Sequence, residues 1–238
     1  MGINKIIAIA SAKGGVGKST VCANLAYLFS KNSKVGILDA DIYGPNQHII
    51  FQLDEIKPEV FEQDGKKFFK PIKSQGIKIN SMGFILDADK AAMWRGPMLS
   101  GAIKQLKDST QWGDLDYLFI DMPPGTGDAY LTVASDIKPD AVILVTTQSP
   151  LAIQDTVKSK AVFDRLNIPI LGYIDNMSFS VCDDCGKTIN DFDSHAASNS
   201  LNIKELGVVP RNNDCAVFDL KSSSKYFKSI YNELLKII

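Results

Sequence analysis

The sequence has few cysteines and almost no net charge. Its 238 residues include four cysteines, and 26 lysines and arginines nearly balance 27 aspartates and glutamates. Four cysteines are too few for a disulfide-stapled secreted protein, and a net charge of −1 gives no overall attraction to nucleic acid or to an anionic membrane. No apolar run reaches the length of about 18 residues that suggests a membrane-spanning helix. We therefore expect a cytoplasmic protein with reduced cysteines that binds no nucleic acid and has no stable membrane association.

Short apolar segments alternate with segments of helical periodicity, which is typical of a parallel sheet covered by helices. We expect one α/β domain over residues 1–238, with a mostly parallel twisted sheet and helices on both faces. An Asp64–Gly65 pair between two β-prone segments predicts a hairpin that leaves the edge of the sheet. The expected strands are Lys5–Ala10, Lys34–Leu38, Ile77–Ser81, Tyr117–Ile120, Ala141–Thr146 and Ile170–Ile174, and the expected helices are Lys18–Lys31, Pro97–Lys107, Ala129–Asp136, Leu151–Leu166 and Ser223–Ile237.

A glycine-rich segment over residues 11–20, Ser-Ala-Lys-Gly-Gly-Val-Gly-Lys-Ser-Thr, lies between the first expected strand and the first expected helix. Its glycines let successive backbone N–H groups point at phosphate oxygens, and the helix N-terminus adds a positive dipole. Lys18 is placed to bind the β- and γ-phosphates, and Ser19 to ligate Mg²⁺. The segment predicts a phosphate loop of a P-loop NTPase. Its expected nucleotide-binding residues are Gly14, Gly15, Val16, Gly17, Lys18, Ser19 and Thr20.

Three aspartates at strand ends complete the expected phosphate site. Asp39 and Asp41 follow one apolar strand, and Asp121 ends another. Because ligands of open α/β sheets bind at the carboxyl ends of the strands, we expect these carboxylates beside the phosphate loop. An aspartate in the position of Asp121 is typical of Mg²⁺ binding through water. The segment 123–128 that follows, with Gly125 in it, predicts a switch loop that approaches the γ-phosphate.

These motifs resemble the deviant Walker A ATPases, the class that contains MinD, ParA and the nitrogenase iron protein, in which the phosphate loop carries a lysine at the position of Lys13. Further segments make the chain similar to the Mrp/ApbC family of iron–sulfur cluster carrier ATPases from about Lys5 to Gly186. They are Asp-Ala-Asp-Ile-Tyr-Gly-Pro-Asn at 39–46, Trp-Arg-Gly-Pro-Met at 94–98, Ile-Asp-Met-Pro-Pro-Gly-Thr-Gly-Asp at 120–128, Asn-Met-Ser at 176–178 and Cys-Asp-Asp-Cys at 182–185.

The resemblance implies a MinD-like fold and a homodimer that encloses two ATP molecules. It implies that Lys13 reaches the partner's phosphates, as an arginine finger would, and that Asp41 orients the attacking water. The matched positions assign Asp39 and Asp121 to the Mg²⁺ shell. They also assign Asn176 to the adenine ring and Pro210–Arg211 to the base pocket. From the residues alone, Asn176 fits equally well as the cap of a turn.

The four cysteines divide into a pair and two single residues. Cys182 and Cys185 flank a short loop, but two ligands do not complete a zinc or iron–sulfur site, which usually has four. A second chain could supply another pair, Cys215 and His195 could close a zinc site, or the pair could be a redox dithiol. The resemblance implies that the pair holds a [4Fe–4S] cluster between subunits. We expect Cys22 in the core and Cys215 outside the cluster site.

The leading hypothesis is an ATPase that accepts an iron–sulfur cluster from a donor and transfers it to apo-proteins. One alternative is a MinD- or ParA-like positioning ATPase that binds membrane or DNA, since the last expected helix carries an apolar stripe with lysines nearby. We expect that stripe to pack on the sheet instead. Another alternative is a zinc-stabilised P-loop ATPase. The stripe consists of Phe227, Ile230, Tyr231, Leu234 and Ile238.

Overall fold

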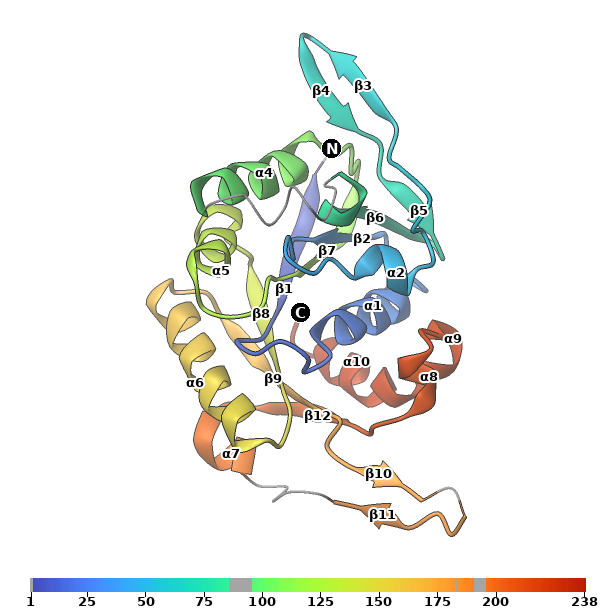
Figure 1. Cartoon of the computed structure of the whole chain (residues 1–238), viewed down its shortest axis with the longest axis vertical. Coiled ribbons are helices and arrows are strands. Elements are labelled where there is room, and N and C mark those ends of the chain that lie inside the picture. The colour runs from blue at the N-terminus through green and yellow to red at the C-terminus, as the bar shows by residue number, and fades with distance from the viewer. Residues whose placement is uncertain (1, 86–95, 183, 191–195) are drawn as a thin grey trace.

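The computed structural model describes residues 2–85, 96–182, 184–190 and 196–238. An eight-stranded sheet runs through the molecule in the order β12-β9-β8-β1-β7-β2-β6-β5, with helices on both faces (Figure 1). All neighbouring strands are parallel except β5 and β6, so the expected mostly parallel α/β sheet is confirmed. Its strands are β1 (Ile3–Ala10), β2 (Val35–Asp39), β5 (Ile72–Ser74), β6 (Ile77–Ser81), β7 (Leu115–Asp121), β8 (Ala141–Thr146), β9 (Ile170–Asn176) and β12 (Glu205–Val209).

Two hydrophobic clusters pack on the two faces of this sheet. Helices α1, α2, α9, η3 and α10 cover one face, and α4, α5, η2, α6 and α7 cover the other. Strands β2 and β8 are buried along their whole length, which explains why they show no polar alternation. The helices are α1 (Lys18–Phe29), α2 (Gln47–Ile50), η1 (Met82–Phe84), α4 (Gly96–Ser109), α5 (Asp128–Thr132), η2 (Val133–Ile137), α6 (Pro150–Arg165), α7 (Ala196–Leu201), α8 (Asn213–Ala216), α9 (Leu220–Ser223), η3 (Ser224–Phe227) and α10 (Lys228–Leu234).

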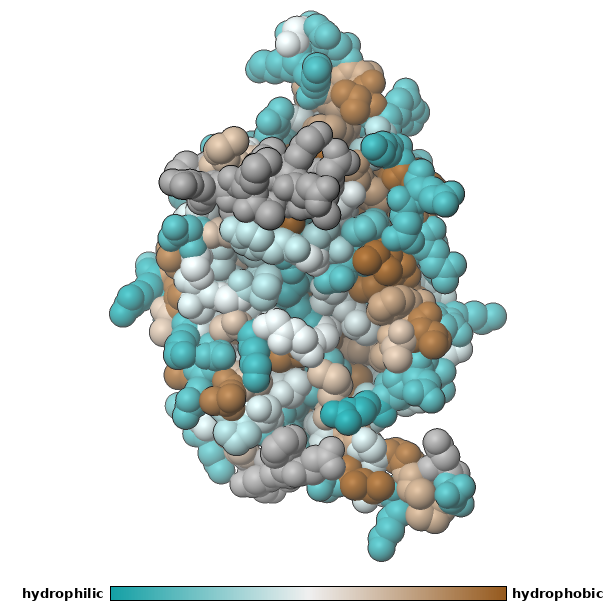
Figure 2. All heavy atoms as spheres, viewed as in Figure 1, coloured by the Kyte–Doolittle hydropathy of each residue, from teal (hydrophilic) through white to brown (hydrophobic). Residues whose placement is uncertain are grey.

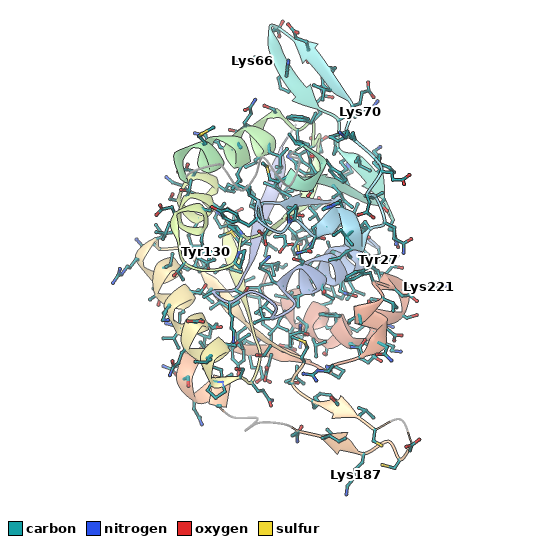
Figure 3. The ribbon with its side chains drawn as sticks, viewed as in Figure 1. Tyr27, Lys66, Lys70, Tyr130, Lys187 and Lys221 are labelled. Carbon is teal, nitrogen blue, oxygen red and sulfur yellow. The ribbon has the colours of Figure 1, made fainter. Side chains whose placement is uncertain are left out.

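Two hairpins project from opposite ends of the molecule (Figure 1). The hairpin expected at Asp64–Gly65 is confirmed: β3 (Val60–Gln63) pairs with β4 (Lys66–Phe69), and both turn residues have positive φ, 53° and 73°. It forms a separate two-stranded sheet, while β5 is the edge strand of the main sheet. The second hairpin, β10 (Ser180–Val181) and β11 (Thr188–Ile189), was not expected from the sequence. Lys66 and Lys187 mark the two projections in Figure 3.

The C-terminal segment differs from the single helix that was expected over Ser223–Ile237. It consists of α9, the 3-10 turn η3 and α10. Serine hydroxyls compete with the helical pattern here, since Ser223 Oγ donates to Asn24 Oδ1 at 2.7 Å and Ser224 Oγ to Lys221 O at 3.2 Å. The apolar stripe packs on the sheet as expected, with the most buried members fully enclosed. These are Phe227, Ile230 and Leu234, each 0% exposed.

None of the helices in the described ranges is both long enough and apolar enough to cross a membrane.

The register of the sheet brings two acidic residues of the expected site together. Asp39 and Asp121 are paired across β2 and β7, so two carboxylates lie side by side at the carboxyl edge of the sheet. That edge also carries the loop between β1 and α1, because β1 pairs with β7 and ends at Ala10.

Candidate functional site

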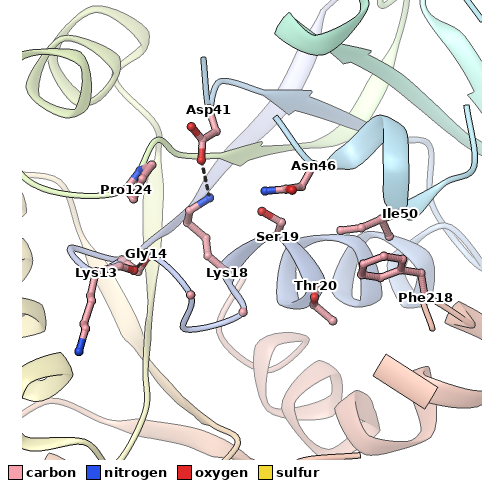
Figure 4. Close-up of a pocket in the computed structure, with 13 residues that line it drawn as sticks. Lys13, Gly14, Lys18, Ser19, Thr20, Asp41, Asn46, Ile50, Pro124 and Phe218 are labelled. Atoms are coloured by element: carbon pink, nitrogen blue, oxygen red, sulfur yellow. Dashed lines mark hydrogen bonds and ion pairs between the residues drawn. The ribbon is translucent and has the colours of Figure 1, made fainter. Parts of the chain in front are cut away.

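The loop over residues 11–17 joins β1 to α1 and lines a cavity of about 260 Å³ (Figure 4). Gly15 and Gly17 have φ values of 82° and 83°, a region that only glycine adopts readily. The N-cap of α1 is Gly17, which has no side chain to bond the first N–H groups of the helix, and these groups can bind an anion. The cavity is lined by Ser11, Lys13, Gly14, Gly15, Gly17, Lys18, Ser19, Thr20, Asp41, Asn46, Ile50, Pro124 and Phe218.

Lys18 lies at the centre of a buried charge cluster. Its Nζ is 2.6 Å from Asp121 Oδ1 and 4.0 Å from Asp41 Oδ2. Burial opposes the charge of the ammonium, but the nearby carboxylates outweigh burial and raise the pKa of Lys18. Asp39 and Asp121 are 0% exposed and Asp41 is 5% exposed. The sequence therefore brings one cation and three carboxylates together, as expected.

Asp39 binds the segment that follows it rather than Lys18. Its Oδ2 accepts hydrogen bonds from Ser81 Oγ at 2.9 Å and from the backbone N–H groups of Asn46 and Gln47, each at 3.0 Å. Burial, and then the charge of Asp121, raise the pKa of Asp39 to about 7. Asp39 thus fixes the loop between β2 and α2 against the end of β6.

Sequence reasoning missed the partners that organise these carboxylates. Gln47 Nε2 donates to Asp121 Oδ2 at 2.8 Å and to Ser19 O at 3.0 Å. Ser81 could have been suspected, because it ends a strand that neighbours β2. Asn46 and Gln47 carry no such signal, since they reach the site only through the fold of the loop after Asp41.

The donor set fits a divalent cation bound with a nucleotide. Three buried carboxylates surround one ammonium, so the fully ionised cluster has an excess negative charge that a low-dielectric site tolerates poorly. Within the described ranges, no three His, Cys, Asp or Glu side chains form a self-sufficient metal site. Mg²⁺ does not require one, because it usually takes one or two carboxylates together with waters and substrate phosphates. Ser19, Asp39 and Asp121 are the residues that would hold it.

The remaining expected nucleotide contacts lie at the rim of the cavity or outside it. Asn176 Nδ2 donates to Val16 O at 2.8 Å, which places this side chain against the phosphate loop. In the switch segment, Pro124 rather than Gly125 lines the cavity. Pro210 and Arg211 are not among the lining residues, and their contact with a base remains a prediction. An apolar wall made by Ile50 and Phe218 was not expected from the sequence.

The cysteine pair lies on the projecting β10–β11 hairpin. Cys182 N–H donates to Lys187 O at 3.0 Å and Gly186 N–H donates to Cys182 O at 2.8 Å, which closes a tight turn. Cys182 is partly exposed and Cys185 exposed, and no disulfide involves either. Val181 and Ile189 are 48% and 49% exposed, and Figure 2 shows hydrophobic side chains on this projection. The hairpin therefore presents two thiols beside uncovered apolar surface.

The other cysteine positions constrain the alternatives. Cys22 is fully buried on α1, as expected, and burial raises the pKa of its thiol well above the ordinary value. Cys215 is partly buried and packs against the core, and burial raises its pKa as well. His195, which was considered as a zinc ligand with Cys215, and Trp94–Arg95 lie outside the described residues.

Curated relatives match much of this chain. An iron–sulfur cluster carrier protein of Pseudomonas fragi is 47% identical over 186 residues, 77% of this chain and 64% of the relative. One from Haemophilus influenzae is 43% identical over 214 residues, 88% of this chain and 57% of the relative. One from Escherichia coli is 45% identical over 186 residues, 78% of this chain and 50% of the relative. The chain thus spans between half and two thirds of the length of these relatives.

Solved structures and a family model agree with this match. A nucleotide-binding protein of Archaeoglobus fulgidus, solved in complex with ADP, has a TM-score of 0.77 and 35% identity, covering 94% of this chain and 89% of that one. Pyrococcus furiosus MinD, at 20% identity over 99% of this chain and 100% of its own, has a TM-score of 0.72 and shows the fold alone. The family model described as NUBPL iron-transfer P-loop NTPase, within ParA, matches residues 2–232. The chain therefore belongs to the ParA-type family of iron-transfer P-loop NTPases.

Proposed function

We propose that this chain is an ATP-hydrolysing carrier that holds a [4Fe–4S] cluster between two copies of itself and passes it to apo-proteins. The observation that carries the proposal is the combination, in one chain, of a phosphate-loop cavity and an exposed cysteine pair on a projecting hairpin. Relatives with the name iron–sulfur cluster carrier protein, at 43% to 47% identity, support it. A cluster donor and apo iron–sulfur proteins would be its partners.

In the hydrolysis step, water attacks the γ-phosphorus of ATP and the bond to the bridging oxygen breaks, giving ADP and phosphate. We assign Asp41 to orient that water, because its carboxylate lines the cavity and lies 4.0 Å from Lys18 Nζ. Lys18 and the N–H groups of the loop would hold the phosphates. Mg²⁺ held through Ser19, Asp39 and Asp121 would neutralise charge on the β- and γ-phosphate oxygens.

Lys13 would act on the partner's nucleotide. Its side chain points away from Lys18 and from the interior of the cavity in Figure 4. Within the described part of the chain, Lys13 makes no ion pair, in contrast to Lys18. A cation that faces outward beside a phosphate cavity fits a role at a two-fold interface, where the same surface of each subunit completes the site of the other.

The cysteine pair would supply half of the ligands for the cargo. A four-iron cluster usually takes four thiolates, and each chain offers Cys182 and Cys185 on its hairpin. Two hairpins that meet at a two-fold axis give the full set. The exposed Val181 and Ile189 favour the same arrangement, because a dimer would cover apolar surface that the single chain leaves in water.

The test is anaerobic reconstitution with iron and sulfide, followed by measurement of the visible spectrum, bound iron and oligomeric state. The wild-type protein should bind a cluster as a dimer, and Cys182→Ala with Cys185→Ala should lose it. Cys215→Ala is the matched control and should keep it. Equal iron in the wild type and the double variant would contradict the proposal, and zinc in place of iron at the pair would favour a zinc-stabilised ATPase.

A further inference from the structure

Gln47 is a buried side chain that connects three parts of the phosphate site. It is the first residue of α2 and is 0% exposed. Its backbone N–H donates to Asp39 Oδ2 at 3.0 Å. Its side-chain Nε2 donates to Asp121 Oδ2 at 2.8 Å and to the carbonyl oxygen of Ser19 at 3.0 Å. One residue therefore holds both aspartates that are assigned to the Mg²⁺ shell, together with the backbone of Ser19.

The other polar atom of the same amide has no partner among the described residues. Gln47 Oε1 is buried and accepts no hydrogen bond within the described residues. A buried acceptor without a partner destabilises the folded state, so a fold usually avoids it unless something else binds there. The two acceptors of Nε2 fix the orientation of the amide, which rules out an exchange of its oxygen and nitrogen. The oxygen is bonded to the same carbon as Nε2, so it lies next to the atom that bonds Ser19 and Asp121.

A hydrated cation supplies the donor that this oxygen lacks. Mg²⁺ retains several waters when it binds with a nucleotide, and those waters donate hydrogen bonds to nearby acceptors. Partners that orient a metal's ligands in this way contribute about 10-fold to 100-fold to metal affinity. We propose that Gln47 is a positioning residue for the magnesium–nucleotide complex: Nε2 holds Asp121 in place, and Oε1 accepts a hydrogen bond from a metal-bound water.

The proposal rests on the magnesium site of the proposed function. It adds that this site is connected to the loop of residues 40–46 and to helix α2. Because the backbone of Gln47 is bonded to Asp39, the loop of residues 40–46 and helix α2 are attached to the side chain that contacts the hydrated cation. Occupancy of the metal site therefore bears on the position of the loop that carries Asp41. A purely structural role for Gln47 would give no such dependence on the metal.

The test compares Gln47→Leu with the wild type by titrating Mg²⁺ into protein with a fluorescent ADP analogue. The Mg²⁺ concentration for half-maximal enhancement of binding should rise about 10-fold or more, while affinity for the analogue in EDTA stays unchanged. Gln148→Leu is the matched control, because Gln148 is also buried and its Oε1 also has no partner in the described part of the chain, but Gln148 makes no hydrogen bond to Ser19 or Asp121. Its half-maximal concentration should equal that of the wild type.

Gln47→Met, unbranched and close to glutamine in length, provides the same measurement if thermal unfolding shows that Gln47→Leu does not fold. An unchanged Mg²⁺ dependence in a folded Gln47 variant would overturn the proposal, as would an equal loss of affinity with and without Mg²⁺. If Mg²⁺ has no effect on the affinity of the wild-type protein for ADP, the assignment of the magnesium site is itself wrong. The wild-type titration thus separates failure of the proposed function from failure of the assignment of Gln47.

Discussion

Asp39 and Asp121 occupy paired positions on neighbouring strands, but only Asp121 is bonded to the ammonium of Lys18. The carboxylate of Asp39 instead accepts hydrogen bonds from Ser81, Asn46 and Gln47. Two aspartates at paired positions of the sheet therefore have different binding partners and different structural roles. Asp121 carries the contact to the phosphate loop, and Asp39 holds the loop that leads to α2. This division leaves the cluster with more negative than positive charge, which a nucleotide-bound cation would balance.

The first prediction concerns Asp175, which is 1% exposed on β9. Burial raises the pKa of Asp175 to about 6, with Glu205 adding to the shift and Gln148 opposing it. The folded state therefore keeps a proton that the unfolded chain releases, and this contribution to stability is lost as the pH rises from about 4 to about 6. Asp175→Asn should remove this loss, so that above that pH range the free energy of unfolding of the variant exceeds that of the wild type by about 3 kcal/mol.

Urea unfolding at several pH values between about 4 and 8 measures this difference. The gap between Asp175→Asn and the wild type should open as the pH rises through the range. Asp136→Asn, a change at an exposed aspartate, should give a curve parallel to that of the wild type. A constant gap for Asp175→Asn would show that its carboxyl titrates alike in the folded and unfolded states.

The second prediction concerns Gly17, whose φ is 83°. A Cβ atom there would lie 2.2 Å from Asn176 Nδ2, so Gly17→Ala must displace the side chain that bonds Val16 O. The left-handed backbone adds about 1–2 kcal/mol of strain. Gly17→Ala should lower both the free energy of unfolding and ADP affinity. Gly14→Ala, where nothing lies within 4 Å, should retain wild-type stability in the same urea experiment.

The third prediction separates a lysine that acts in its own subunit from one that acts on the partner. Lys13→Ala and Asp41→Ala should each abolish ATP hydrolysis when assayed alone. Mixed in equal amounts under conditions of subunit exchange, they should recover about a quarter of the wild-type rate, since half of randomly paired dimers are mixed and each holds one complete site. A mixture that remains inactive, although exchange is shown by labelled subunits, would place Lys13 in its own site.

The fourth prediction concerns the turn that carries the cysteine pair. Gly186 has a φ of 68°, and nothing lies within 4 Å of an added Cβ, so only its backbone conformation resists substitution. Gly186→Ala should weaken retention of a reconstituted cluster, while Gly186→Asn should keep it, because asparagine tolerates this region. Iron release to a chelator is the measurement. Equal weakening by both variants would indicate that the side chain, rather than the backbone, is at fault.

Much of the fold could be predicted from local patterns. The apolar run that forms β8 has the expected bounds, and β6 likewise, because buried parallel strands are recognisable from composition alone. Strand β12 was missed because Gly207 interrupts it. That glycine has a φ of 154°, and a Cβ there would meet Ile230 Cγ1 at 2.7 Å. A glycine is needed at this position because α10 packs closely against it, and no local sequence pattern indicates that contact.

The candidate site likewise contains residues that the sequence motifs predict and residues that they do not predict. Lys18, Asp41 and Ser19 line the cavity as their motif predicts, since each is set by its place at the end of a strand or the start of a helix. Gln47 and Phe218 could not be found, because the first reaches Asp121 through tertiary contacts and the second arrives from the far end of the chain. Contacts between residues distant in sequence leave no trace in a single sequence.

The chain after β9 runs directly from the phosphate loop to the cysteine pair. Asn176, the last residue of β9, bonds Val16, and the chain continues through residues 177–181 to Cys182. Between them the chain is pinned twice, where Ser178 N–H donates to Val209 O at 3.0 Å and Arg211 N–H donates to Phe179 O at 2.8 Å. The cysteine hairpin therefore leaves the body of the protein from a stretch of chain that is anchored to the phosphate loop at one end and to the end of β12 at the other.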